Sequence, residues 1–399
     1  MVTLDSTSDC GDKPRKMSEI RYLRIPGFFG LIVVALSLAL ACEKRNSTPL
    51  GYGELRREIS DPASLIVNRP LRDTSFSALV PAGSSTSVLA GTFQGYEARA
   101  LLRFEVSDTV VTNHATLAKI RLRRQNKLGT GPLDISLCTL IEPWEERWST
   151  WIEADSATPW TTPGGAVSDT IASATIGEID SLTFTISRSE LPSVIEPSNN
   201  GLILISGNNS LADFYSRETT SPPLLFVHYY RGDEAEVDTL VPVADASIIY
   251  TDYEVPEGRL IVGNGHVFRT LIQFDLSSIP EGATINYGTL ELSIDTLESS
   301  FETMNLGAYR LTGEWNGDQT PFDDAISSSV EVTSSETSVR IDLASLLQGC
   351  VSAEDFGLLL RSSSEFSNIS RIAFFSGEAD SANRPRLAIY YTLPPGFRG

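Results

Sequence analysis

The chain contains an internal repeat, and this repeat limits the possible folds more than any other feature of the sequence. The segment Arg99–Ser107 recurs as Arg269–Ser277, 170 residues later. Two further blocks recur in the same order: Gly201–Leu204 as Gly357–Leu360, and Phe214–Glu218 as Phe374–Glu378. Because several blocks agree in order and nearly in spacing, we infer two homologous domains.

The repeat also predicts where the domains begin and end. The first domain is expected at residues 62–231 and the second at residues 236–394, with a linker at residues 232–235. Each copy is long enough to bury a hydrophobic core of its own. Because the linker is short, we expect the two domains to lie close together.

Both copies consist of short segments in which polar and apolar side chains alternate. Lys119–Arg123 alternates charged and apolar residues, and its counterpart Thr289–Ser293 keeps the apolar positions. A period of two predicts strands that expose one face to water. Clusters of Gly, Pro, Asn and Ser separate these segments. We therefore expect an all-β protein with a jelly-roll-like β-sandwich in each copy, a barrel being the alternative. The one helical segment is expected at Leu343–Gln348.

A short apolar run, residues 27–42, ends on a cysteine and is followed at once by charged residues. Arg21 and Arg24 supply a basic segment before the run, so Met17 is the better start of a secretory signal. The alternative is a transmembrane anchor, but the uncharged stretch is just shorter than the ~20 apolar residues that a spanning helix needs.

The end of this run, Ala39–Cys42, resembles the lipobox of bacterial lipoproteins, whose cysteine is lipidated and becomes the new N-terminus. The resemblance implies a signal segment at residues 1–41, a lipid on Cys42 that binds the membrane, and a flexible tether at residues 42–61. Glu43 is not the aspartate that retains such proteins in the inner membrane of enterobacteria. We therefore expect an outer-membrane lipoprotein of the bacterial cell envelope.

The charge of the chain limits its partners. The net charge is −20. Binding to nucleic acid needs clustered Lys and Arg, so we expect no nucleic acid partner. Some of the carboxylates could hold a structural calcium ion, although a solvated acidic surface is the simpler interpretation.

The sequence contains no local motif of a catalytic or metal site. The three histidines, His114, His228 and His266, form no pair at metal-ligand spacing, and HExxH, GxSxG and phosphate-loop motifs are absent. We therefore expect no cofactor and predict no catalytic residue. Two cysteines follow Cys42 in the domains, Cys138 and Cys350, and we expect both to be small core residues.

Four of the five tryptophans fall in one short acidic segment: Trp144, Trp148, Trp151 and Trp160. Aromatic faces with a polar handle are suitable platforms for the C–H patches of sugars, so this segment is a candidate glycan-binding loop. The alternative is a loop whose tryptophans cap the open end of the sandwich core. Trp144 and Trp151 have aromatic counterparts in the second copy, so Trp148 and Trp160 are the better ligand candidates.

A second candidate site is basic. Lys119, Arg121 and Arg123 should share the solvent face of one strand, where they could bind an anionic group. The second copy has no such row, so an anionic ligand should prefer the first copy. The alternative is a solvated sheet face without a ligand.

The repeated pattern resembles the DNRLRE-domain family of bacterial and archaeal secreted proteins. The elements that carry the likeness are the strand Leu101–Glu105 with its copy Leu271–Asp275, the segment Trp144–Trp151, and the closing segment Phe214–Leu224. The second copy departs at the tryptophan segment, where it has Trp315 and Phe322. The resemblance implies β-sandwich modules. A related carbohydrate-binding family includes members that bind acidic polysaccharides such as alginate, which implies a glycan ligand.

These features together predict a non-catalytic lipoprotein of the cell envelope whose tandem β-sandwich modules bind polysaccharide. A structural or adhesive envelope protein with a protein partner is the first alternative. A polysaccharide-degrading enzyme is the second, because two close carboxylates suffice for glycoside hydrolysis and the chain is rich in Asp and Glu.

Overall fold

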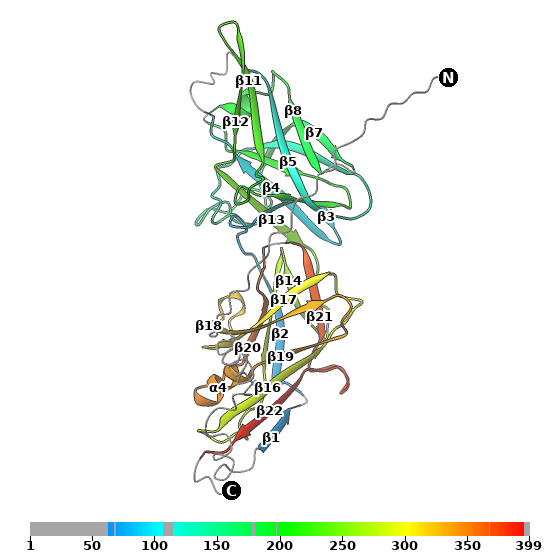
Figure 1. Ribbon diagram of the computed structural model, residues 1–399, viewed down its shortest axis with the longest axis vertical. Coiled ribbons are helices and arrows are strands. Elements are labelled where there is room, and N and C mark those ends of the chain that lie inside the picture. Colours follow the sequence, from blue (N-terminus) through cyan, green and yellow to red (C-terminus); the bar gives the residue numbers. More distant parts are fainter. Residues whose placement is uncertain are drawn as a thin grey trace, which may run out of the picture. The chain divides into compact units, whose positions relative to one another are not determined.

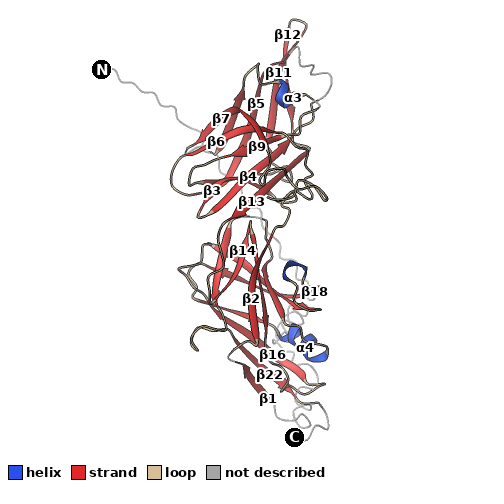
Figure 2. Cartoon of the chain, turned by 180° about the vertical axis from the view of Figure 1, so that it is seen from behind, coloured by secondary structure: helices blue, strands red, loops and turns tan. Residues whose placement is uncertain are grey.

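The computed structural model describes residues 63–67, 69–106, 115–177, 180–196, 198–366 and 368–394. Strands dominate this part of the chain, its helices are short, and its strands pair antiparallel (Figure 2). The prediction of an all-β fold is thus confirmed. The predicted signal segment, Cys42 and the predicted tether lie outside the described residues. Within the described ranges, no helix has the length and apolar character needed to cross a bilayer.

The first sandwich consists of two sheets that face each other across one core (Figure 1). One sheet contains, in spatial order, β10 (Leu211–Tyr215), β3 (Ser87–Phe93), β4 (Tyr96–Arg103), β9 (Leu202–Ile205), β6 (Leu133–Leu140) and β7 (Val167–Ile176). The other contains β12 (Glu234–Leu240), β11 (Leu224–Arg231), β5 (Ala115–Leu128) and β8 (Ser181–Ile186). The long strand β5 joins the two sheets, because its last residues pair with β10. A short helix, α3 (Pro192–Ile195), follows β8.

The alternation of side chains along the strands builds this core. On β5, Ala118, Ile120 and Leu122 are fully buried, and the residues between them face solvent. Burial of one Leu or Ile side chain stabilises the folded state by roughly 1.5–3 kcal/mol. The same face-by-face division recurs on β8, where Leu182 and Phe184 point inward. The period of two seen in the sequence therefore identifies the inward faces correctly.

The second sandwich repeats this plan. One sheet contains β18 (Phe322–Thr333), β17 (Thr303–Leu311), β20 (Leu358–Ser362), β15 (Val267–Gln273), β14 (Arg259–Asn264) and β21 (Ser370–Phe375). The other contains β1 (Ala63–Val67), β22 (Arg386–Thr392), β16 (Thr284–Ser293) and β19 (Ser338–Asp342). The expected helical segment is α4 (Ala344–Ser352), and a single 3-10 turn, η1 (Gly317–Gln319), precedes β18. Cys138 and Cys350 are buried free thiols, one in each copy, as expected.

The first two strands of each copy are exchanged between the sandwiches. β2 (Arg72–Ala78) pairs with β15 and β1 pairs with β22, so both complete the sheets of the second copy. In return, β13 (Ala244–Thr251) pairs with β4 and β12 pairs with β11, so both complete the sheets of the first copy. In Figure 1, β2 is blue and lies among the yellow to red strands of the second copy. The boundaries of the two sandwiches therefore differ from the boundaries of the two sequence copies, residues 62–231 and 236–394.

Matching hydrogen bonds show that the exchange is reciprocal. The Ile261 N–H donates to Ser75 Oγ at 2.8 Å, and the Leu89 N–H donates to Ser247 Oγ at 2.9 Å. The acceptors lie on β2 and β13, and the donors lie on β14 and β3. Each exchanged strand thus satisfies a buried N–H group of the copy that receives it.

A second matching pair involves the closing motif of each copy. Asp73 on β2 accepts a hydrogen bond from the Gly377 N–H at 2.6 Å, and Asp245 on β13 accepts one from the Arg217 N–H at 2.7 Å. Gly377 and Arg217 occupy the same place in the repeated segments that follow β21 and β10. Each exchanged strand therefore also accepts a hydrogen bond from the closing motif of the copy that receives it.

The exchange can be tested with paired cysteines. In the variant Ser75→Cys/Thr270→Cys, thiols replace two hydroxyl groups that lie 2.8 Å apart on register partners of β2 and β15. Register partners in an antiparallel pair are close enough for a disulfide. Ser247→Cys/Ala100→Cys probes the reciprocal pair. We expect both variants to form an intramolecular disulfide, detected as a mobility shift on a non-reducing gel.

The control variant is Ser75→Cys/Ala100→Cys, which pairs β2 with a strand of its own copy. It should remain reduced under the same oxidation. A disulfide in the control, together with none in the two test variants, would mean that the strands stay within their own copies.

Candidate functional site

The basic residues predicted on one strand face do share the solvent face of β5. Lys119, Arg121 and Arg123 alternate with buried apolar residues, and we call these three side chains the cation row. Among the described residues, none of the three forms an ion pair, and Arg123 donates only to the Ser221 hydroxyl at 3.4 Å. The neighbouring Arg124, by contrast, pairs with Asp180 at 3.3 Å. The cation row therefore keeps most of its donors available for a ligand.

Aromatic side chains lie beside the cation row. Phe226 on β11 is the register partner of Lys119, and the Arg121 guanidinium lies 5.0 Å from the centre of the Phe226 ring. The Arg123 guanidinium lies 5.7 Å from the ring of Tyr215. Cation–π contacts of this kind hold the guanidinium groups in place without neutralising them. The face thus combines fixed positive charge with flat apolar surface.

The cation row borders a groove of about 690 Å³, which the sequence did not reveal. Arg121 and Arg123 line this groove, and the rest of the lining is Asp180, Ser181, Thr220, Ser221, Pro222 and Leu224. The segment Thr220–Pro222 follows the closing motif of the repeat, so only the fold brings it to β5.

The second copy has a groove at the equivalent place, with different chemistry. Its lining consists of Glu291, Ser293, Ser381, Ala382, Arg384 and Arg386, and its volume is about 580 Å³. Glu291 stands where the first copy has Arg121, and it is paired with Arg340 at 2.9 Å. Both grooves are thus lined by two arginines and one carboxylate, but these charged side chains stand at different positions in the two copies.

The structure buries most of the tryptophan segment. The exposed fractions are 2% for Trp144, 7% for Trp151, 4% for Trp160 and 44% for Trp148. The indole N–H of Trp160 donates to the Thr150 carbonyl at 2.9 Å. For Trp144, Trp151 and Trp160 this burial favours the alternative of a core cap, because a covered ring offers no face to a sugar. Trp148 keeps an open face and remains a ligand candidate.

The capping role of the buried tryptophans has a counterpart in the second copy. The Trp144 indole donates to the carbonyl of Asn200 at 2.9 Å, and the Trp315 indole donates to the carbonyl of Phe356 at 2.7 Å. These two carbonyls precede the repeated Gly-Leu blocks in each copy. Trp144 and Trp315 thus perform the same structural task.

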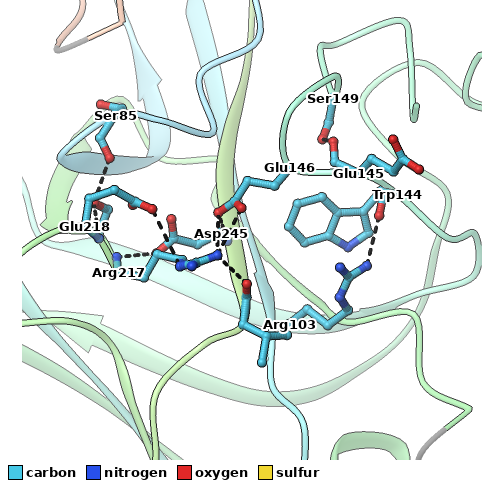
Figure 3. Close-up of polar contacts among 11 residues, drawn as sticks. Ser85, Arg103, Trp144, Glu145, Glu146, Ser149, Arg217, Glu218 and Asp245 are labelled. Carbon is cyan, nitrogen blue, oxygen red and sulfur yellow. Dashed lines mark hydrogen bonds and ion pairs between the residues drawn. The ribbon is translucent and has the colours of Figure 1, made fainter. Parts of the chain in front are cut away.

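Three carboxylates meet near the first copy's closing motif (Figure 3). Oxygens of Glu146, Glu218 and Asp245 lie within 4.8 Å of one another. The Arg217 guanidinium bonds Glu146 at 3.0 Å and Glu218 at 3.5 Å, and the Asp245 N–H donates to Glu146 at 3.0 Å. We call these four residues the acidic clamp. It ties the tryptophan segment, β13 and the closing motif together.

Burial raises the pKa of the Asp245 carboxyl to about 8. The hydrogen bond from the Arg217 N–H opposes this rise, and the charges of Glu218 and Glu146 add to it. Of the described residues, the acidic clamp is the place where a calcium ion could bind through several carboxylates. The Arg217 guanidinium already contacts oxygens of Glu146 and Glu218, so a calcium ion would have to displace it.

No family model and no curated protein match this chain. Among solved structures, the N-terminal CBM22-1-CBM22-2 tandem domain of Xyn10C from Paenibacillus barcinonensis is 10% identical, with a TM-score of 0.15. The comparison covers 84% of this chain and 98% of that one. A likeness this low carries no argument about the ligand, and the resemblance to the DNRLRE-domain family stays a prediction.

Removal of the cation from the acidic clamp should destabilise the protein. In Arg217→Met, Glu146 and Glu218 lose their cation, whereas Asp245 keeps the hydrogen bond from the backbone N–H of residue 217. Hydrogen bonds to charged groups are each worth about 1.5–3 kcal/mol before solvent screening. We expect a loss of roughly 1–3 kcal/mol in the free energy of unfolding, measured in urea at pH 8. The loss should shrink below pH 7, because Asp245 is then protonated and fewer negative charges repel one another.

The matched control is Arg231→Met, which breaks an exposed ion pair with Glu236 at 3.3 Å. Exposed pairs contribute less than about 1 kcal/mol. Calcium should raise the melting temperature of Arg217→Met more than that of the control. Equal urea midpoints for the two variants would show that the clamp does not contribute to stability.

Proposed function

We propose that this chain is a non-catalytic lipoprotein of the cell envelope whose first sandwich binds an acidic polysaccharide along the cation row. One observation carries the proposal: three cations that form no ion pair with any described residue stand in line on a sheet face, beside aromatic rings and a groove. Alternate residues of a strand lie about 7 Å apart on one face. A row of evenly spaced cations suits a ligand that repeats its charge along a chain.

The overall charge of the protein limits how such a ligand binds. A net charge of −20 repels a polyanion at long range. Salt at 0.1 M screens this repulsion beyond about 10 Å, so contacts at the cation row decide the affinity. Weak binding at low ionic strength and a shallow salt dependence are therefore expected.

The lining of the groove supports a binding role rather than a catalytic one. Glycoside hydrolysis uses two carboxyl groups roughly 5–10 Å apart. Asp180 is the one carboxylate in the lining of the groove beside the cation row. The three carboxylates of the acidic clamp are held by Arg217 and belong to a structural contact.

Charge removal at the cation row tests the proposal. Arg121→Ala/Arg123→Ala should weaken binding to alginate or polygalacturonate by roughly tenfold to a hundredfold, since each charge-assisted contact contributes about 1 kcal/mol or more. Retardation of the purified protein in affinity gels that contain each polysaccharide measures this effect. The control Arg69→Ala/Arg231→Ala removes the same charge from two exposed sites that do not line the groove.

Two results would contradict the binding proposal. One is an equal loss of retardation in the test and control variants, since the effect would then come from net charge alone. The other is a lack of retardation by every acidic polysaccharide. Retardation by neutral glucans that is lost in Trp148→Ala would instead assign the ligand to the exposed tryptophan.

The lipoprotein part of the proposal rests on the resemblance of Ala39–Cys42 to a lipobox. Cys42→Ala should abolish incorporation of labelled palmitate and move the protein from the membrane fraction to the soluble fraction. Cys10→Ala is the control, because this cysteine precedes the apolar run and should carry no lipid. Palmitate incorporation that persists in Cys42→Ala would rule out this anchor.

A further inference from the structure

The groove of the second copy receives its arginines from a different segment than the groove of the first. Arg386 begins β22 and is the register partner of Glu291 on β16. In the first copy, the register partners that line the groove are Leu224 on β11 and Arg121 on β5. Arg384 precedes β22 and lines the second groove together with Arg386, and we call these two residues the arginine pair. The second copy thus lacks a row of cations on β16, but the segment after its closing motif brings two cations to the groove.

The arginine pair is available to an anion. Neither side chain forms an ion pair or a hydrogen bond with any described residue. Glu291 is the one carboxylate in the lining, and it is already paired with Arg340 at 2.9 Å. A guanidinium group presents parallel N–H donors that match the two oxygens of a carboxylate. The lining of the second groove therefore favours a ligand that carries a carboxylate.

Two exposed aromatic rings lie on the same sheet face as the arginine pair. Tyr287 on β16 and Tyr390 on β22 are register partners, and their ring centres are 6.0 Å apart. The two residues, which we call the tyrosine pair, are 48% and 47% exposed. Open aromatic faces with a polar group are suitable platforms for the C–H patches of sugars. Tyr390 is four residues beyond Arg386 on the solvent side of β22, which places it about 13 Å further along the strand.

Small side chains lie between the arginine pair and the tyrosine pair. Ala388 is the intervening residue on the solvent side of β22, and its register partner on β16 is Thr289. At the equivalent place in the first copy, the register partners are the larger Phe226 and Lys119. The sheet face between the two pairs therefore carries no large side chain on either of these strands, and an extended ligand can lie along β22.

We propose that the solvent face of β16 and β22 is a second site for the acidic polysaccharide. The arginine pair binds a carboxylate of the chain, and the tyrosine pair stacks on a sugar ring further along it. This inference rests on the proposed function for the class of its ligand, and it adds a site in the copy that has no cation row. The separation of about 13 Å between the two pairs requires several linked sugars rather than one.

Titration calorimetry of the full chain with tetragalacturonate at low ionic strength counts the sites. We expect two sites in the unaltered chain and one in Arg384→Ala/Arg386→Ala. The matched variant Arg121→Ala/Arg123→Ala removes the same charge from the first groove and should also keep one site. The chain with all four substitutions should keep none. Galacturonate alone should bind the second site at least about tenfold more weakly, because it reaches only one of the two pairs.

Two further variants test the second site without removing its arginines. Ser381 is exposed in the lining of the second groove, so Ser381→Glu places a carboxylate beside the arginine pair and should abolish the second site alone. Tyr390→Ala removes half of the tyrosine pair and should weaken the second site roughly threefold to tenfold.

The outcomes separate this inference from the proposed function. A single site that is lost in Arg121→Ala/Arg123→Ala and kept in Arg384→Ala/Arg386→Ala would overturn the second site and leave the proposed function standing. A single site with the opposite response would contradict the role of the cation row instead. Absence of binding by the unaltered chain would overturn both.

Discussion

The structure depends on the backbone hydrogen bonds that β4 and β15 receive from strands of the opposite copy. A strand inside a sheet must satisfy its N–H and C=O groups on both sides, and an unpaired side is costly and prone to aggregation. β13 and β2 meet this need across the exchange, so neither sandwich is complete on its own. The closing motif of each copy is held by a hydrogen bond to one of these exchanged strands.

Duplication has left two copies that agree on the inside and differ outside. Ile120 and Leu290 are both fully buried at equivalent positions, whereas Arg121 and Glu291 face the two grooves with opposite charge. Buried positions are held by packing, which tolerates little change in volume. Outward positions on a wet sheet face are free to vary, so the two copies can serve different ligands on one scaffold.

Much of the fold could be predicted from the sequence, because side-chain periodicity reports burial directly. The solvent face of Lys119, Arg121 and Arg123 followed from alternation alone. The strand exchange could not be predicted, because ladder bonds are made by backbone atoms and the equivalent strands of the two copies offer the same pattern. Burial of Trp160 was missed because no counterpart in the second copy marks it.

The place of β1 has a mechanical consequence. Although β1 is the first strand of the described chain, it pairs antiparallel with β22, close to the other end of the sequence. Tension applied at residue 63 therefore runs through β1 and β2 before it reaches β3. A pull on the N-terminal side would have to shear these strands from the second sandwich first. The second sandwich therefore bears such a load before the first does.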